Sequence, residues 1–140
     1  EPELRDVIPN TVQSAYSNVT DMLTKYPNDG DISAVWACWD IPQIGATQAI
    51  EAAGRKGIKT YAIDGSPEVV EMVANPESAA GAVGAQQPYE IGRSAARNAA
   101  RYLAGEHVAP FTFVPAVLVT KENAKETAAP FLAKKAGAAN

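Results

Sequence analysis

The sequence predicts an α/β domain built on an open parallel sheet with helices on both faces. Three short strands are expected at residues 34–38, 59–63 and 80–85, where apolar runs are bounded by turn-forming residues. They begin 25 and 21 residues apart, and a helical pattern fills each gap. This is the spacing of βαβ units, whose crossover helices pack against a parallel sheet.

The segments around these strands are mostly helical in pattern. Apolar residues recur at helical spacing before the first strand, and prolines and glycines mark most of the helix ends. Trp36, inside the first strand, is expected in the core. The segment FTFVPAVLVT is expected to be extended, and a short helical tail follows it. The helices are predicted at residues 10–26, 41–53, 66–74 and 88–103.

Composition narrows the range of partners. The chain has 140 residues, with 12 basic against 16 acidic side chains and a net charge of −4. Its basic residues are scattered, which argues against nucleic acid and acidic membranes and favours a neutral ligand. The single cysteine, Cys38, is expected to be a small buried residue. His107 is the only histidine and no CxxC pattern occurs, so no metal site is expected. No cofactor is expected.

Polar and aromatic side chains follow each predicted strand. Trp39 and Asp40 come after the first strand, Asp64 ends the second, and Gln86 follows the third. In an open parallel sheet ligands bind beyond the carboxyl ends of the strands, where the loops converge. Carboxylates and amides can bind sugar hydroxyls, and an aromatic ring can cover a C–H surface. These four residues therefore form a candidate site for a neutral polyhydroxy ligand.

Each of these residues also has a structural interpretation. Asp40 can cap the following helix, with Gln43 at the capping-box distance. Trp39 can seal the rim of the core. Asp64 can form an Asx-turn over the next glycine, and Gln86 or its neighbour can satisfy backbone groups in a loop. A ligand role is favoured for Asp64, because Ser66 already occupies the cap position before Pro67.

Catalytic signatures are weak. The segment DGSPE at residues 64–68 has one glycine and no lysine, unlike a phosphate-binding loop. A serine triad would need His107, which lies after a helix-terminating glycine and far from the strand ends. Arg93, Arg97 and Arg101 recur every four residues, as on a solvated helix face. We therefore do not expect an enzyme.

Four segments carry a family resemblance: AVWACWDIPQIGATQAIEAAGR, TYAIDGSPEVVEMV, AVGAQQPYEIGRSAARNAARYLAG and VPAVLVTKEN. They resemble the second half of a type I periplasmic sugar-binding protein of the ribose-binding kind, which serves ABC transporters. By position, the resemblance implies that Asp64 and Gln86 bind sugar hydroxyls and that Trp39 touches the ligand. Ribose-type members have an amide residue at the position of Trp39. Stacking would there replace a hydrogen bond, so another pentose, a hexose or a polyol is possible.

The resemblance also implies a domain organisation. Residues 1–86 would form most of the second lobe of a two-lobed protein, residues 87–113 would cross to a first lobe, and residues 114–140 would return as a strand and helical tail. The first lobe would be missing or on another chain. Helix 88–103 would then expose its apolar face unless it found another partner, and a signal peptide would precede the fragment.

The implied function is capture of a monosaccharide or polyol in the periplasm and delivery to an ABC permease, without catalysis. Asp64 and Gln86 would bind hydroxyls, Trp39 would stack, and Asp40 would position its loop. The alternative is the effector-binding domain of a LacI-type repressor, which shares the fold. A signal peptide at the missing N-terminus would indicate transport, and a helix-turn-helix would indicate regulation. A small Rossmann-like enzyme is a third possibility, disfavoured by the absent phosphate loop.

Overall fold

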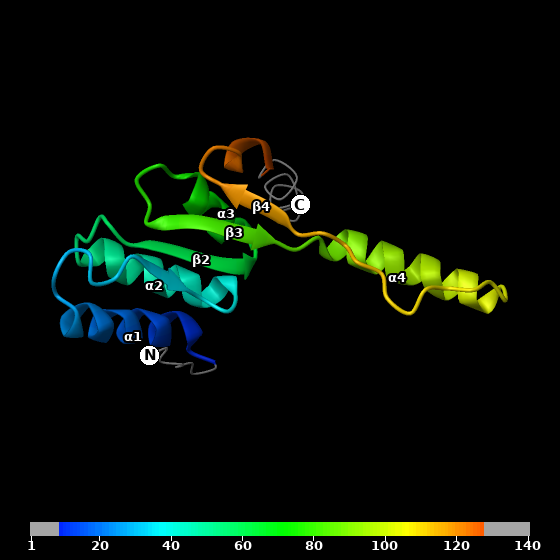
Figure 1. The fold of residues 1–140 in the computed structure, drawn as a ribbon, viewed down its shortest axis with the longest axis horizontal. Coiled ribbons are helices and arrows are strands. Elements are labelled where there is room, and N and C mark those ends of the chain that lie inside the picture. The colour runs from blue at the N-terminus through cyan, green and yellow to red at the C-terminus, as the bar shows by residue number, and fades with distance from the viewer. Residues whose placement is uncertain (1–8, 128–140) are drawn as a thin grey trace, which may run out of the picture. The chain divides into compact units, whose positions relative to one another are not determined.

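A computed structural model of the chain describes residues 9–127. The described residues divide into two compact units: unit 1 comprises residues 9–85 and 118–127, and unit 2 comprises residues 86–117. Figure 1 shows the elements of both.

Unit 1 is an α/β body. Its described helices are α1 (Thr11–Lys25), α2 (Asp40–Ala52) and α3 (Pro67–Ala74), and its strands are β1 (Ala34–Trp36), β2 (Lys59–Asp64), β3 (Ala80–Ala85) and all but the first residue of β4 (Val117–Thr120). Each of the three predicted strands is present, and the third has the predicted bounds. The predicted helices also form, with ends within about two residues of the expected positions.

The four strands form one sheet in the order β1-β2-β3-β4. β1 pairs with β2 and β2 with β3 in parallel, as the βαβ spacing predicts. β4 runs opposite to β3, so the sheet is mixed (Figure 1). The β2–β3 register shifts between Thr60 and Tyr61, where Gly81 is the extra residue on β3.

The core of unit 1 lies between the sheet and the helices α2 and α3. Val69, Val70 and Val73 of α3 are fully buried with Ala62 and Val83 of the sheet. A second cluster joins α1 to α2 through Val19, Leu23, Ala49, Ile50 and other apolar side chains. The two helices pack closely at Gly45, where any Cβ would lie 2.1 Å from the Val12 carbonyl oxygen.

The opposite face of the sheet carries exposed aromatic and aliphatic side chains. Trp36 is 65 % exposed, and its register partner Tyr61 is 37 % exposed. The prediction that Trp36 belongs to the core is therefore wrong. Strand alternation does separate Trp36 from Val35, but Val35 is the residue that faces the helices. Cys38 is also exposed, because β1 ends at Trp36 and leaves it in the following loop.

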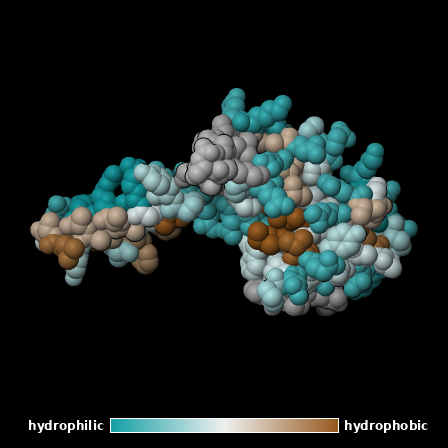
Figure 2. All heavy atoms as spheres, turned by 180° about the vertical axis from the view of Figure 1, so that it is seen from behind, coloured by the Kyte–Doolittle hydropathy of each residue, from teal (hydrophilic) through white to brown (hydrophobic). Residues whose placement is uncertain are grey.

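Unit 2 consists of α4 (Pro88–Leu103) and the extended segment that follows it. The helix has the predicted bounds, and none of its residues is buried. Tyr89, Ile91, Tyr102 and Leu103 are exposed. Apolar atoms lie along one side of this unit and polar atoms along the other (Figure 2). Within the unit, the Gln87 side chain donates a hydrogen bond to the Pro115 carbonyl, and Asn98 donates one to Thr112.

Candidate functional site

The candidate site lies at the carboxyl edge of the parallel strands. Trp39 is half-buried and occupies the N-cap position of α2 in an extended conformation. Asp64 is the last residue of β2 and is half-buried. Its register partner on β3 is Ala85, and Gln86 follows Ala85 in the chain as the first residue of unit 2. The strand ends at which these residues stand are thus neighbours in the sheet.

Asp64 has an unusual backbone conformation. Its φ is +95°, and it is the only non-glycine residue in the described part of the chain with a positive φ. This conformation costs about 1–3 kcal/mol for a residue with a Cβ, and it persists only where the surrounding structure enforces it. Such strain concentrates at functional sites, so the geometry at Asp64 motivates a functional role.

Gly65 continues the same turn with a φ of +79°. A Cβ on Gly65 would lie 2.7 Å from the Ala85 Cβ and 2.8 Å from its Cα. The turn therefore lies directly against the end of β3, and only glycine satisfies both the conformation and the contact.

Asp40 is almost completely buried, at 5 % exposure. Its Oδ2 accepts a hydrogen bond of 2.6 Å from the backbone N–H of Ser66. Ser66 is the N-cap residue of α3 and follows the strained turn. This bond joins the segment after β1 to the segment after β2, and so brings Trp39 and Asp64 into neighbouring parts of one edge.

The predicted capping role of Asp40 on its own helix is wrong. Trp39 occupies the N-cap position of α2, and no side-chain cap hydrogen bond is present there. Gln43, the predicted capping-box partner, is fully buried, and its Nε2 donates to the carbonyls of Thr60 and Ala82. These two carbonyls flank the register shift between β2 and β3. The local spacing that suggests a capping box cannot indicate hydrogen bonds to residues so distant in the sequence.

Ser66 occupies the N-cap position that the sequence predicts, and Pro67 follows at the first helical position. The Ser66 hydroxyl, however, makes no cap hydrogen bond and is buried without a partner. The backbone of Ser66 is bonded at both ends: its N–H donates to Asp40, and its carbonyl accepts from the Val70 N–H at 3.0 Å. The bond between Ser66 and Asp40 joins residues 26 positions apart, so local sequence patterns do not indicate it.

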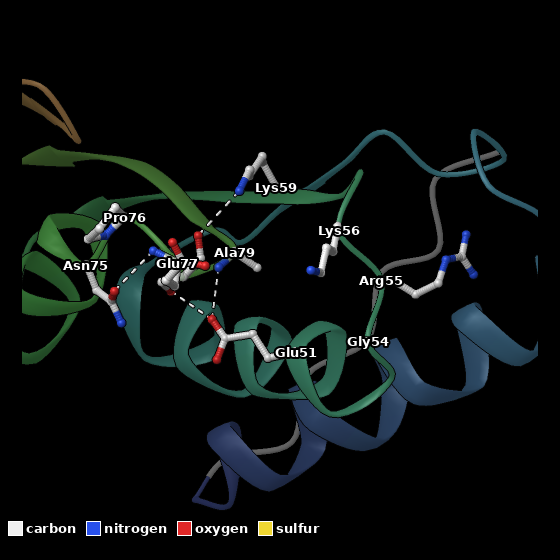
Figure 3. Close-up of a pocket in the computed structure, with 10 residues that line it drawn as sticks. Glu51, Gly54, Arg55, Lys56, Lys59, Asn75, Pro76, Glu77 and Ala79 are labelled. Carbon is white, nitrogen blue, oxygen red and sulfur yellow. Dashed lines mark hydrogen bonds between the residues drawn. The ribbon is translucent and has the colours of Figure 1, made fainter.

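A polar hollow of about 450 Å³ lies at the amino edge of the sheet, opposite to the edge that carries the candidate site (Figure 3). Its charged side chains are largely engaged with the protein itself. Glu51 Oε1 accepts hydrogen bonds from the Ser78 hydroxyl at 2.8 Å and the Ala79 N–H at 2.9 Å. Lys59 Nζ donates to the Ser78 carbonyl at 3.3 Å. The hollow is lined by Glu51, Gly54, Arg55, Lys56, Lys59, Asn75, Pro76, Glu77, Ser78 and Ala79.

Lys121, after β4, reinforces the same loop. Its ammonium donates to the Asn75 carbonyl at 2.7 Å and to the Ser78 carbonyl at 3.0 Å. Partial burial, and then the nearby Lys59, lower the pKa of Lys121. The polar groups at this edge thus hold the loop between α3 and β3 in place.

Neither a metal-binding cluster nor a membrane-spanning helix is found in the described part of the chain. Among residues 9–127, no group of three or more histidine, cysteine, aspartate or glutamate side chains is arranged to hold a metal ion. Among the same residues, no helix combines the length and apolar character needed to cross a membrane.

A family model of the periplasmic binding protein domain matches residues 3–107. The chain belongs to this family. This periplasmic binding protein domain is 32 % identical over 102 residues to the ribose import binding protein RbsB of Escherichia coli strain K12. That match covers 73 % of the chain and 33 % of the relative.

Two solved structures show how far the similarity of this periplasmic binding protein domain extends. An ABC sugar transporter subunit from Rhodobacter sphaeroides 2.4.1 is 76 % identical, with a TM-score of 0.83, over 88 % of this chain and 44 % of that one. An ABC transporter solute-binding protein from Agrobacterium vitis with bound allitol is 56 % identical, with a TM-score of 0.85, over 91 % and 44 %. The chain thus spans less than half the length of these relatives.

Proposed function

We propose that this chain is the second lobe of a solute-binding protein that captures a neutral sugar or polyol and delivers it to an ABC permease. The observation that carries the proposal is the 56 % identity, over 91 % of the chain, to a solute-binding protein with bound allitol. The protein would act in the periplasm and would make or break no covalent bond. The first lobe would complete the site and exclude water from it.

The proposed ligand contacts of unit 1 lie at the carboxyl edge of the sheet, and the proposed contact Gln86 is the first residue of unit 2. Asp64 accepts hydrogen bonds from ligand hydroxyls, and the Gln86 amide can both donate and accept. Trp39 offers a flat apolar surface against C–H groups, as in sugar stacking. The strained backbone of Asp64 supports this role, because strain is retained where a side chain must point in one direction.

Transport is favoured over the repressor alternative by the relatives described above. RbsB is an import binding protein, and the two similar structures are ABC transporter components. RbsB is named for ribose, a sugar, and the Agrobacterium vitis protein was solved with bound allitol, a polyol. A neutral ligand also agrees with the scattered basic residues and the net charge of −4.

Calorimetry of the full-length protein that contains this chain tests the proposal. The panel is allitol, D-allose, D-ribose and L-arabinose, each titrated into the wild type and into Asp64→Ala. We expect at least one of them to bind, and the substitution to weaken that binding about 100-fold, or about 2.7 kcal/mol. Asp29→Ala is a matched control, because Asp29 is an exposed aspartate paired with Arg55. Failure of the whole panel, or a loss of less than about twofold in Asp64→Ala, would contradict the proposal.

A further inference from the structure

The turn at the end of β2 has two features that need an external constraint. Asp64 and Gly65 are consecutive residues with φ values of +95° and +79°. An isolated chain would leave this conformation readily, because Asp64 gains by returning to the usual negative φ. The contact of Gly65 with Ala85 limits the turn on one side. Something must also hold the end of the turn where it joins α3.

Asp40 supplies that second constraint. Its Oδ2 lies 2.6 Å from the Ser66 N–H, which is the short distance of a charge-assisted hydrogen bond. The carboxylate is 5 % exposed, so water competes poorly for the bond. Asp40 is also the first residue of α2, where the helix dipole favours a negative charge.

The bond lies at the junction of the turn and α3. Ser66 is the N-cap residue of α3, and its N–H is one of the helix-start N–H groups that have no intrahelical acceptor. By accepting that N–H, Asp40 anchors the last residue of the turn together with the start of the helix. Because Asp40 follows Trp39 directly, the same bond also fixes the position of the segment that contains Trp39 relative to the Asp64 turn.

We propose that Asp40 is a positioning residue that acts on the ligand through Asp64, by fixing the Asp64–Gly65–Ser66 turn. The inference rests on the proposed function, because it assumes that Asp64 binds the ligand. Asp40 itself stays behind the site, since its carboxylate is buried on the Ser66 N–H. Preorganising the turn leaves less motion to be lost when the ligand binds, and so raises affinity.

A double-mutant cycle on the full-length protein tests this role, with the tightest binder among allitol, D-allose, D-ribose and L-arabinose as the probe. We expect Asp40→Ala to weaken binding about tenfold in the wild-type background and less than about twofold in Asp64→Ala. Asp40→Asn keeps an oxygen that can accept the Ser66 N–H, so it should restore most of the affinity. An equal loss in both backgrounds would show that Asp40 does not act through Asp64, and would overturn the proposal.

Glu51→Ala is the matched control. Glu51 is likewise a helix α2 carboxylate that accepts a backbone N–H of a later segment, but at the opposite edge of the sheet. Its removal should lower stability and leave affinity within about twofold, measured well below the unfolding temperature. An affinity loss in Glu51→Ala equal to that in Asp40→Ala would mean that general loosening explains both, and would overturn the proposal.

Hydrogen exchange of the ligand-free protein separates this inference from the proposed function. Asp40→Ala should raise the exchange rate of the Ser66 amide at least about tenfold, and Glu51→Ala should leave it unchanged. Unchanged Ser66 exchange in Asp40→Ala would overturn the positioning role whatever the protein binds. Failure of the wild type to bind any member of the panel would instead overturn the proposed function.

Discussion

The two edges of the sheet carry similar polar residues but use them differently. At the amino edge, Glu51 and Lys121 make hydrogen bonds to the loop between α3 and β3, and these bonds hold Ser78 and Ala79. At the carboxyl edge, the chain keeps Asp64 in a strained conformation and buries Asp40 to hold the adjoining turn. The hydrogen bonds at the amino edge stabilise the fold, whereas the carboxyl edge retains a strained backbone conformation at Asp64.

Under the proposed function, this difference corresponds to an amino edge that stabilises the fold and a carboxyl edge that binds the ligand. A polar group bound to its own backbone mainly stabilises, whereas a residue held in strain indicates selection for something other than stability. The amino-edge hollow of about 450 Å³ would be an obvious ligand site by size alone. The hydrogen bonds of Glu51 and Lys59 show that these polar groups of the hollow already serve the fold.

The largest effect is expected at Gly65. Gly65→Ala places a Cβ at 2.7 Å from the Ala85 Cβ in a backbone with φ +79°, so it combines overpacking with strain. We expect the free energy of unfolding to fall by about 3 kcal/mol, measured by urea denaturation. Gly54→Ala is the matched control, because Gly54 also has a positive φ but no atom within 4 Å of its Cβ position. Equal losses in the two variants would show that the contact with β3 carries no energy.

The next effect is expected at the amino edge. Glu51→Ala removes the acceptor of the Ala79 N–H and the Ser78 hydroxyl, and should lower the free energy of unfolding by about 2 kcal/mol. Glu51→Gln keeps an amide oxygen in place and should recover about half of this loss. Thermal unfolding of both variants measures the difference. A ligand affinity reduced along with stability in Glu51→Ala would erase the distinction between the two edges.

A smaller effect separates the strain at Asp64 from its side chain. Asp64→Gly and Asp64→Ala both remove the carboxylate, but only glycine adopts φ +95° without a steric penalty. Asp64→Gly should therefore be more stable than Asp64→Ala by about 1 kcal/mol in urea denaturation, although both lose the ligand contact. Equal stability of the two variants would indicate that the positive φ stores no strain.

The smallest effect concerns pH. The pKa of Lys121 is lowered in the folded chain, so between that pKa and the ordinary lysine value the unfolded chain binds more protons. Stability conferred by Lys121 should therefore rise as pH increases through this window. The difference in unfolding free energy between wild type and Lys121→Met should widen in favour of the wild type as the pH rises toward the ordinary lysine pKa of about 10.5. Denaturation curves at several pH values measure it, and a constant difference would contradict the assignment.

The sequence predicted the helices and the three parallel strands because local patterns determine them, but it did not indicate that β4 runs opposite to β3. Strand spacing and helix-ending glycines and prolines gave the three parallel strands, and the bounds of β3 and α4 agree with the prediction. The polar ends of the strands were also visible, since each follows an apolar run. Their meeting at one edge follows from parallel strand geometry alone.

Contacts between residues that are far apart in the chain could not be predicted from the sequence. The spacing between Asp40 and Gln43 predicted a capping role for Gln43. Its side chain instead binds carbonyls of residues 17 and 39 positions away, which local spacing cannot indicate. The exposure of Trp36 depends on which face of the sheet the helices cover, which alternation does not specify. The positive φ of Asp64 and its constraint by Asp40 arise only when β2, β3 and α2 come together.

Backbone amide shifts in an NMR titration test the central claim most directly. The full-length protein is titrated with the best ligand of the panel, and the two edges of the sheet are compared. We predict the largest shifts at Trp39 and at residues 64–66 of the carboxyl edge, with little change at Lys59, Ser78 and Ala79 of the amino edge. Shifts concentrated at the amino edge, with residues 64–66 unmoved, would contradict the account.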